Sequence, residues 1–279
     1  MTTPIVVAVL IAALLHASWN AIAHSITDRL LGFALIGAGG MLATLPFLFV
    51  VGLPPIEAWP ILLGSLVTHL LYLGLLMLSY RTGDFGQVYP LARGTAPWVV
   101  ALIGVVFLGE TLPPREFIGV LVISAGLMVL VFAGGMPKRH HVPALAAAFA
   151  TGLAIACYTV VDAYGVRLTQ NPLGYITWVM MLQGPVFLLV AIATRRRRLV
   201  AQLRPIWKVG LAGGAVSAGA YGLVLWAQLS GAVAGIAALR ESSIVFAALI
   251  GLVFFRERFG PVRILASAVV VAGVLLLAL

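Results

Sequence analysis

Two arginines lie inside apolar stretches of the sequence, and their chemistry suits the binding of a small charged solute. Arg93 lies in VYPLARGTAP and Arg240 in GIAALRESS, at an offset of 147 positions. A guanidinium is planar and always charged, and its fork of N–H donors matches a carboxylate or a phosphonate in a two-point contact. The alternative is that Asp162 or Glu241 neutralises the arginines, in which case the pair is structural.

Asp162 and Glu241 are the only carboxylates that lie well inside apolar stretches. A charged carboxylate is costly inside a membrane. Such a group therefore favours its protonated form and can carry a proton. Either residue is therefore a candidate for proton coupling in a transport cycle. The alternative, that each only neutralises a nearby arginine, stays open here.

Further polar residues recur at helical spacing inside the apolar stretches. His16, Trp19 and Asn20 occupy positions i, i+3 and i+4, and Tyr158 begins a similar i, i+4 pair in a later stretch. Lipid cannot satisfy a polar stripe, so it should face a cavity or the bundle interior. The alternative is hydrogen bonding to a neighbouring helix. The candidate substrate-binding residues are Arg93, Arg240, Asn20, Trp19, His16, Tyr89 and Tyr158.

Helix-breaking residues gather around Arg93. Pro90, Gly94 and Pro97 surround it closely. Proline removes a backbone donor and crowds the carbonyl four residues earlier, which predicts a bent or partly unwound helix. These three residues are the candidate hinge, and the alternative is a kink that only improves packing.

The sequence lacks the motifs of hydrolytic and nucleotide-dependent enzymes. It contains no HExxH, no Walker pattern and no GxSxG. The single cysteine, Cys157, excludes an internal disulfide and a cysteine-rich metal site. We therefore expect no catalytic residues, no metal and no cofactor, and we do not expect an enzyme.

The composition places the chain in a lipid bilayer. It is 62% hydrophobic and 9% charged, whereas soluble domains are about half apolar and about a quarter charged. The net charge of +9 does not indicate nucleic-acid binding, because the basic residues cluster between apolar stretches. A helix needs roughly 20 apolar residues to cross the hydrocarbon core. Ten stretches qualify, at 4–24, 30–51, 58–80, 86–108, 115–134, 143–166, 172–194, 205–229, 233–255 and 260–279.

The second half of the sequence repeats the first. At the offset of 147, without a gap, Arg93 aligns with Arg240 and the run 101–104 with 248–251. A register held through two apolar stretches indicates duplication. We therefore expect an all-α membrane protein of ten transmembrane helices in two five-helix repeats. The repeats span residues 1–139 and 140–279, and they are inverted because five is an odd number.

Basic residues are distributed unevenly between the two sets of loops. Of the 17 lysines and arginines, Arg93 and Arg240 lie deep inside apolar stretches, and only Arg115 and Arg167 follow even-numbered stretches. The other thirteen follow odd-numbered stretches, so the positive-inside rule places those loops in the cytoplasm and both termini outside. The run Arg195–Arg198 is expected to face anionic headgroups. The first apolar stretch lacks the preceding Lys or Arg of a signal peptide, so we expect it to be retained.

Ten helices in inverted repeats, together with several local strings, resemble the EamA family of the drug/metabolite transporter superfamily. The strings are LLHASWNAIAH, VYPLARGTAP, FLGETL and FFRERF. The resemblance covers essentially the whole chain and implies a carrier for a small metabolite in a bacterial inner membrane. It does not imply one substrate, because the superfamily handles amino acids, sugars, nucleotide sugars and other solutes. One departure is Arg256-Glu257, where the family pattern has Gly-Glu, as in Gly109-Glu110.

We therefore predict a secondary transporter that moves a small polar metabolite, anionic or zwitterionic, by alternating access. Its expected partners are that solute, the lipid bilayer and, if a carboxylate couples transport, protons; no nucleic acid is expected. The sequence makes no prediction of oligomeric state. The alternatives are a channel-like facilitator and, with less support, an integral-membrane enzyme.

Overall fold

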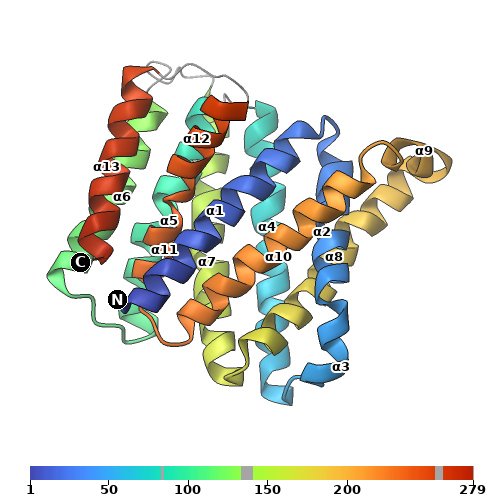
Figure 1. Ribbon diagram of the computed structural model, residues 1–279, viewed down its shortest axis with the longest axis horizontal. Helices are drawn as coiled ribbons and strands as arrows, with labels where there is room; N and C mark the ends of the chain where they lie inside the picture. The colour runs from blue at the N-terminus through green and yellow to red at the C-terminus, as the bar shows by residue number, and fades with distance from the viewer. Residues whose placement is uncertain (83–84, 133–140, 255–259, 279) are drawn as a thin grey trace.

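The protein is an all-α membrane protein, as predicted. The computed structural model describes residues 1–82, 85–132, 141–254 and 260–278, and these residues form helices and turns without a strand (Figure 1). The long helices are α1 (Thr3–Ser25), α2 (Arg29–Thr44), α4 (Trp59–Thr82), α5 (Phe85–Phe107), α6 (Pro114–Val131), α7 (Val142–Thr169), α8 (Pro172–Arg195), α10 (Trp207–Gln228) and α13 (Pro261–Ala278). The short ones are η1 (Leu45–Phe47), α3 (Leu48–Val51), η2 (Ile56–Ala58), η4 (Arg196–Arg198), α9 (Leu199–Leu203), α11 (Val233–Arg240) and α12 (Ser243–Phe254).

The helical segments match the apolar stretches closely in position. Within the described ranges, nine segments are long and apolar enough to cross a membrane, and Ile264–Ala278 is a shorter apolar helix. Helices are favoured because lipid offers no partner for a backbone N–H or C=O, and a helix satisfies these groups internally. Several helices also begin with local signals. The Asp28 side chain accepts from the Leu31 amide at the start of α2, and Asn171 accepts from Gly174 at the start of α8.

The stretch expected to form one helix over 233–255 is broken in the structure. Helix α11 ends at Arg240 and α12 begins at Ser243. The amides of Glu241 and Ser242 bond to the carbonyls three residues earlier, at 3.0 and 3.1 Å, so the chain tightens at the break. No glycine or proline lies between 236 and 250 to signal it. The break coincides with the burial of Glu241 against two arginines, described below.

The partial unwinding expected near Pro90 and Pro97 does not occur, because both prolines lie inside the continuous helix α5. Gly94 instead serves close packing: a Cβ there would lie 2.9 Å from the Leu127 Cβ on α6. Helix α5 packs along α6 and α7 and also contacts α11. These neighbours supply the protein surroundings in which a membrane helix tolerates proline. The hinge role of Pro90, Gly94 and Pro97 stays a prediction.

The helices pack as a bundle in which segments distant in sequence lie side by side. Helix α6 packs along α13 at one edge, and α2 packs between α8 and α10 at the other (Figure 1). Helix α10 approaches α2 so closely that a Cβ on Gly214 would lie 2.6 Å from the Gly40 nitrogen and 2.7 Å from the Gly39 Cα. Small residues that admit backbone contact are typical of helix pairs in membranes.

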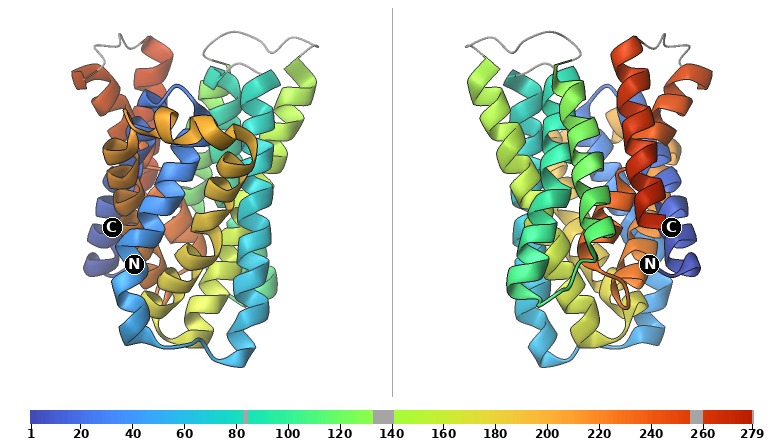
Figure 2. Two further views of the ribbon diagram at one scale, coloured as in Figure 1. Left: turned by 90° about the vertical axis from the view of Figure 1, so that its right-hand side faces the viewer. Right: turned by 90° about the vertical axis from the view of Figure 1, so that its left-hand side faces the viewer.

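The bundle has two ends, each formed by a different set of connections between helices (Figures 1 and 2). The end we call the Glu110 end carries the connections at 108–113, 170–171 and 229–232. The Asp28 end carries the connections at 26–28 and 196–206, with the basic residues Arg195–Arg198. An ion pair of 2.6 Å between Asp28 and Arg195 joins α2 to α8 there. The assignment of the Asp28 end to the cytoplasm stays a prediction from the positive-inside rule.

Candidate functional site

The two arginines singled out by the sequence converge on a single carboxylate. Arg93 projects from α5, Arg240 is the last residue of α11, and Glu241 lies in the break between α11 and α12. The Arg93 Nε lies 2.7 Å from Glu241 Oε2, and the Arg240 Nε lies 3.9 Å from Oε1. Arg93 also donates from Nη2 to the Ser243 hydroxyl at 3.2 Å. The cluster is buried, with Arg93 4%, Arg240 5% and Glu241 0% exposed.

This cluster holds more positive charge than its carboxylate neutralises. One Glu241 faces two guanidiniums, which leaves a formal excess of one positive charge. The short Arg93–Glu241 contact is an ion pair, and within the described residues the Arg240 Nε and Nη2 are buried without a hydrogen-bond partner. Buried donors left unpaired are costly. The site therefore has unused capacity to donate to an anion.

Four aromatic side chains surround the arginines from separate helices. His16 of α1 and Tyr72 of α4 interact electrostatically with both guanidiniums, as does Tyr89 of α5. Tyr158 of α7 interacts with Arg93. These residues bring α1, α4 and α7 to the contact between α5 and α11. The structure thus assembles His16, Tyr89 and Tyr158 with the arginine pair, and it adds Tyr72.

Trp19 and Asn20, which share a polar stripe with His16, form their hydrogen bonds within α1. The Trp19 Nε1 donates to the His16 Nδ1 at 3.2 Å, and the Asn20 amide donates to the His16 carbonyl at 2.7 Å. Trp19 therefore fixes the orientation of the His16 ring. Asn20 is half-buried, and its side-chain amide bonds within its own helix rather than to another helix in the described part of the chain.

Asp162 belongs to a second cluster, and the suggestion that it neutralises an arginine is wrong. Its Oδ1 accepts from the Tyr175 hydroxyl at 2.9 Å, and its Oδ2 accepts from the Tyr221 hydroxyl. No lysine, arginine or histidine nitrogen in the described part of the chain forms an ion pair with it. Asp162 points from α7 toward α8 and α10 instead, where tyrosines rather than cations meet it.

Tyr158 lies between the two clusters. It stacks on the His69 ring at 4.1 Å between centroids and meets Tyr72 edge-on at 5.5 Å. His69 in turn meets Tyr221 at 5.8 Å. His69 of α4 thus packs against side chains of α7 and α10. Sequence reasoning missed Ser243 and Tyr175. Ser243 lies three residues after Arg240, a helical spacing that could have pointed to it, whereas Tyr175 lies on a different helix from Asp162.

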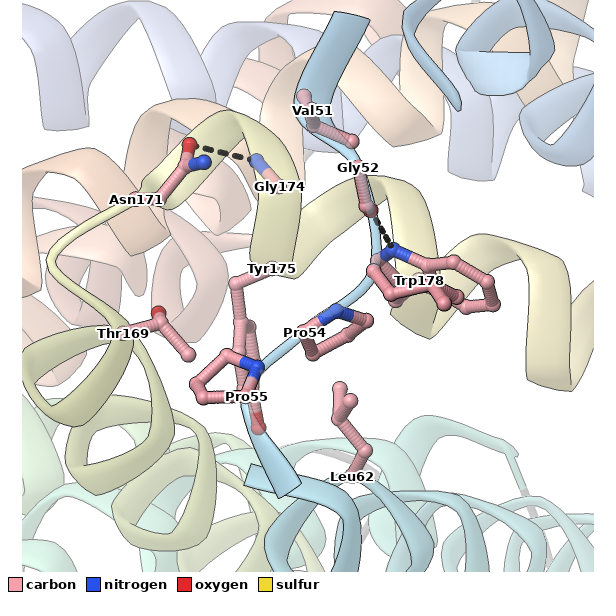
Figure 3. Close-up of a pocket in the computed structure, with 11 residues that line it drawn as sticks. Val51, Gly52, Pro54, Pro55, Leu62, Thr169, Asn171, Gly174, Tyr175 and Trp178 are labelled. Carbon is pink, nitrogen blue, oxygen red and sulfur yellow. Dashed lines mark hydrogen bonds between the residues drawn. The ribbon is translucent and has the colours of Figure 1, made fainter. Parts of the chain in front are cut away.

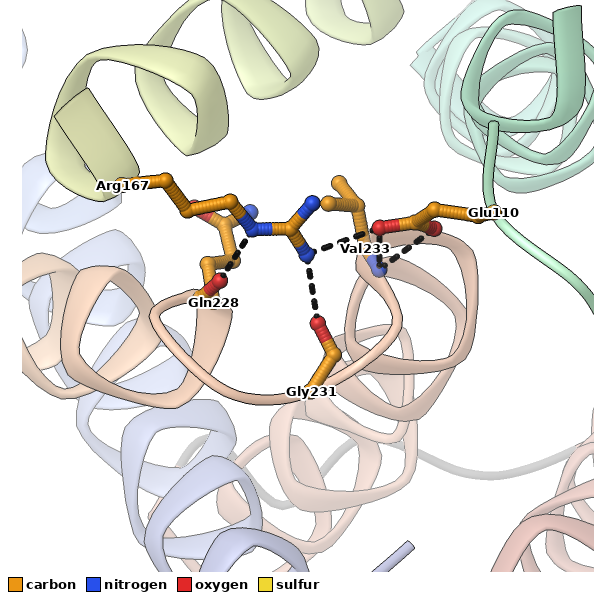
Figure 4. A network of polar contacts seen from close by, with 5 residues as sticks. All are labelled: Glu110, Arg167, Gln228, Gly231 and Val233. Carbon is orange, nitrogen blue, oxygen red and sulfur yellow. Dashed lines mark hydrogen bonds and ion pairs between the residues drawn. The ribbon is translucent and has the colours of Figure 1, made fainter. Parts of the chain in front are cut away.

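A third polar cluster closes the Glu110 end of the bundle (Figure 4). The Arg167 Nη2 lies 2.7 Å from Glu110 Oε1 and donates to the Gly231 carbonyl at 2.8 Å. Its Nε donates to the Gln228 carbonyl at 2.9 Å. Both Glu110 oxygens accept from the Val233 amide, at 3.0 and 3.2 Å. We call these residues the Glu110 cluster. Sequence reasoning did not single out this cluster, although Glu110 aligns with Glu257 at the offset of 147.

A small pocket of about 70 Å³ lies near the α3–α4 connection (Figure 3). The side chains of Tyr175 and Trp178 line it opposite Pro54 and Pro55. The Trp178 Nε1 donates to the Gly52 carbonyl at 2.9 Å, which ties α8 to this connection. The pocket has room for little more than water, and it lies away from the arginines. Its lining offers no charged group for a solute.

Metal chemistry has no observed basis in the described residues. Among them, no three His, Cys, Asp or Glu side chains gather in a way that could hold a metal ion. The Arg256-Glu257 pattern lies outside the described residues.

Comparisons with known proteins agree with the architecture. The second half of the chain, residues 142–279, matches the EamA-like transporter family. No curated protein matches the sequence. A solved structure described as "Crystal structure of protein" is similar over 99% of this chain and 96% of its own, with a TM-score of 0.75 and 18% identity. At that identity the likeness shows the fold alone.

Proposed function

The chain belongs to the EamA-like transporter family, of the drug/metabolite transporter superfamily, and on that premise we propose that it moves a small anionic or zwitterionic metabolite across the bacterial inner membrane. It is a multi-pass membrane transporter by family, which fits the expectation that it is not an enzyme. The finer proposal rests on one observation, the buried arginine pair with its single carboxylate.

The arginine pair suits an anionic group because its charge is only partly compensated. Arg240 keeps buried donors without a hydrogen-bond partner, and a carboxylate or phosphonate oxygen supplies what they lack. Charge in a membrane interior is costly and tends to mark a solute or ion pathway. The solute would displace part of the Arg240–Glu241 contact, which at 3.9 Å is the weaker of the two.

Alternating access is supported by the discontinuous helix and by the packing of one end. Glu241 lies between two half-helices near the middle of a membrane-spanning segment, an arrangement found at transporter binding sites. Toward the Glu110 end, Val233, Ala234 and Ile236 are 0% exposed, so the chain packs tightly between the arginines and that end. Such closure favours a carrier over an open channel. The sequence duplication supplies two repeats, and alternating access would move one repeat against the other.

The test compares lysine variants at the two arginines. Lysine keeps the charge but not the two-point fork, so Arg93→Lys and Arg240→Lys should fold and insert. Each should weaken binding of the best anionic solute by roughly tenfold to a hundredfold, because a hydrogen bond to a charged group contributes about 1.5–3 kcal/mol. Arg195→Lys, at the Asp28 end, is the matched control and should bind normally.

Binding is measured by thermal shift of the purified protein against carboxylates, phosphonates, amino acids and sugars, since a ligand of the folded state raises its apparent stability. Wild-type affinity for an anionic solute in either arginine variant, at normal expression, contradicts the proposed site. A wild-type protein stabilised only by neutral sugars contradicts the anionic class while leaving the family assignment intact.

A further inference from the structure

Glu110 occupies a position that the backbone prepares for it. After α5 ends, Gly109 adopts φ 63°, a left-handed conformation that favours glycine. The chain turns there, and the Glu110 amide bonds back to the Gly104 carbonyl at 3.1 Å. Gly104 also leaves room for the carboxylate, because a Cβ at that position would lie 3.2 Å from Glu110 Oε2. The two glycines together aim the Glu110 side chain at the start of α11.

The Glu110 carboxylate caps α11 from another part of the chain. The first amides of a helix lack partners within it, and the residue at the N-cap position normally supplies one. Here that residue is Ala232, whose side chain has no polar group with which to cap the helix. Glu110 replaces it by accepting from the Val233 amide with both oxygens. Its negative charge at a helix N-terminus is also favourable to the helix dipole.

Arg167 fastens this cap to two more helices. It comes from the last turn of α7 and pairs with Glu110 while donating to the carbonyls of Gln228 and Gly231. The Arg167 cation lies at the C-terminal carbonyls of α10, and the Glu110 anion lies at the N-terminus of α11. Each charge is favourable to the dipole of the helix end that it contacts. The α10–α11 connection is thus held at both helix ends by one ion pair (Figure 4).

Helix α11 connects this cap directly to the arginine site. It has eight residues and ends at Arg240, so the cap and Arg240 are about 12 Å apart at 1.5 Å per residue. All of its residues are buried. The break after Arg240 separates α11 from α12, so α11 can shift as a short rigid segment. A shift at Val233 would move Arg240 and Glu241 with it.

We propose that Glu110 and Arg167 are positioning residues for the solute site: by capping and anchoring α11 they set where Arg240 and Glu241 stand relative to Arg93. This inference rests on the proposed function for its biological meaning, but its physical content concerns the position of α11. When the Glu110 cluster separates, the arginine pair loses its geometry, which links closure of this end to the affinity of the site.

The experiment reads the site directly, without any solute. Protein labelled with ¹⁵N-arginine gives Nε–H signals for Arg93 and Arg240, assigned by their loss in the lysine variants. Glu110→Ala removes the cap and the ion pair together. Val233→Pro removes the amide that donates to Glu110 and leaves the Glu110–Arg167 ion pair in place; it also replaces a buried side chain, and it lies at the first helical position, where proline is well tolerated. Amide exchange across Val233–Arg240 is measured alongside.

Asp28→Asn is the matched control, because Asp28 also caps a helix and pairs with an arginine. It accepts from the Leu31 amide and pairs with Arg195 at the other end of the bundle. Glu110→Ala and Val233→Pro should both shift the Arg240 signal, and Glu110→Ala should speed amide exchange in α11 at least about fivefold. Asp28→Asn should leave both readouts at wild-type values.

An unchanged Arg240 signal in Val233→Pro, and in Glu110→Ala wherever that variant folds, overturns the inference and leaves the cluster a purely structural contact. Binding of methylphosphonate separates this result from the proposed function. If the wild type binds it and Glu110→Ala binds it several-fold more weakly, both proposals are supported. If the wild type binds no anion while the Arg240 signal still moves, the anionic site is wrong and the positioning role stands.

Discussion

Glu241 is the residue whose removal best tests how the buried charges are balanced. The change Glu241→Gln keeps the size of the side chain and removes only its charge. It leaves Arg93 and Arg240, 4% and 5% exposed, without the carboxylate that forms ion pairs with them in the described part of the chain. Two guanidiniums then face each other in a buried site, so the folded protein should lose stability.

The magnitude follows from the depth of the site. Removing one partner of a buried ion pair costs about 3–5 kcal/mol, because a charge is left buried and uncompensated. In a chain of this length, about 1 kcal/mol corresponds to roughly 2 °C in the melting temperature. We therefore expect Glu241→Gln to melt roughly 6–10 °C below the wild type in the absence of any anion.

An anion should restore much of this loss, and that response separates a binding site from a structural pair. If the arginines bind the solute, Glu241 competes with it, and removing Glu241 should increase the stabilisation by methylphosphonate. At a concentration of 100 times Kd a ligand contributes about 2.7 kcal/mol. Thermal unfolding in detergent is recorded with and without methylphosphonate, using Asp28→Asn as the control. A variant with wild-type melting and a wild-type response to the anion would refute the charge balance inferred here.

Two further predictions concern packing and orientation. Gly214→Ala should lower the melting temperature, because its Cβ would lie 2.6–2.7 Å from backbone atoms of α2 and overpacking costs about 1–3 kcal/mol. Gly74→Ala is the control: nothing lies within 4 Å of the new Cβ, so this change should be neutral or stabilising. Equal melting of the two variants would contradict the close α2–α10 contact. The positive-inside rule places the C-terminus outside. Alkaline phosphatase fused after Leu279 should therefore be active, and green fluorescent protein fused there should be dark. The reverse pattern means that the orientation is inverted.

The class of the protein, the position of nearly every helix and the identity of the charges at the arginine site could be predicted from the amino-acid sequence. These features depend on local properties. A hydrocarbon core of about 30 Å demands stretches of roughly 20 apolar residues, and such stretches are visible without knowledge of any contact. The cost of a guanidinium in lipid likewise marked Arg93 and Arg240 as residues that need partners. The register of the duplication further indicated that the two belong together.

Only the tertiary structure decided which partners these residues have. Glu241 lies beside both arginines, whereas Asp162, equally apolar in its sequence surroundings, is held by Tyr175 and Tyr221 on other helices. The choice depends on which helix faces which, and helical periodicity within one segment carries no information about its neighbours.

The break at Glu241 has the same origin. Pro90 and Pro97 signal a bend locally, yet α5 stays helical, while the chain is interrupted within 236–250, a stretch that holds no glycine or proline. The cap of α11 is likewise supplied by Glu110, 123 positions earlier in the chain. Interactions between segments so far apart in sequence outweigh local propensity once the helices pack, and they are therefore decided only in the folded protein.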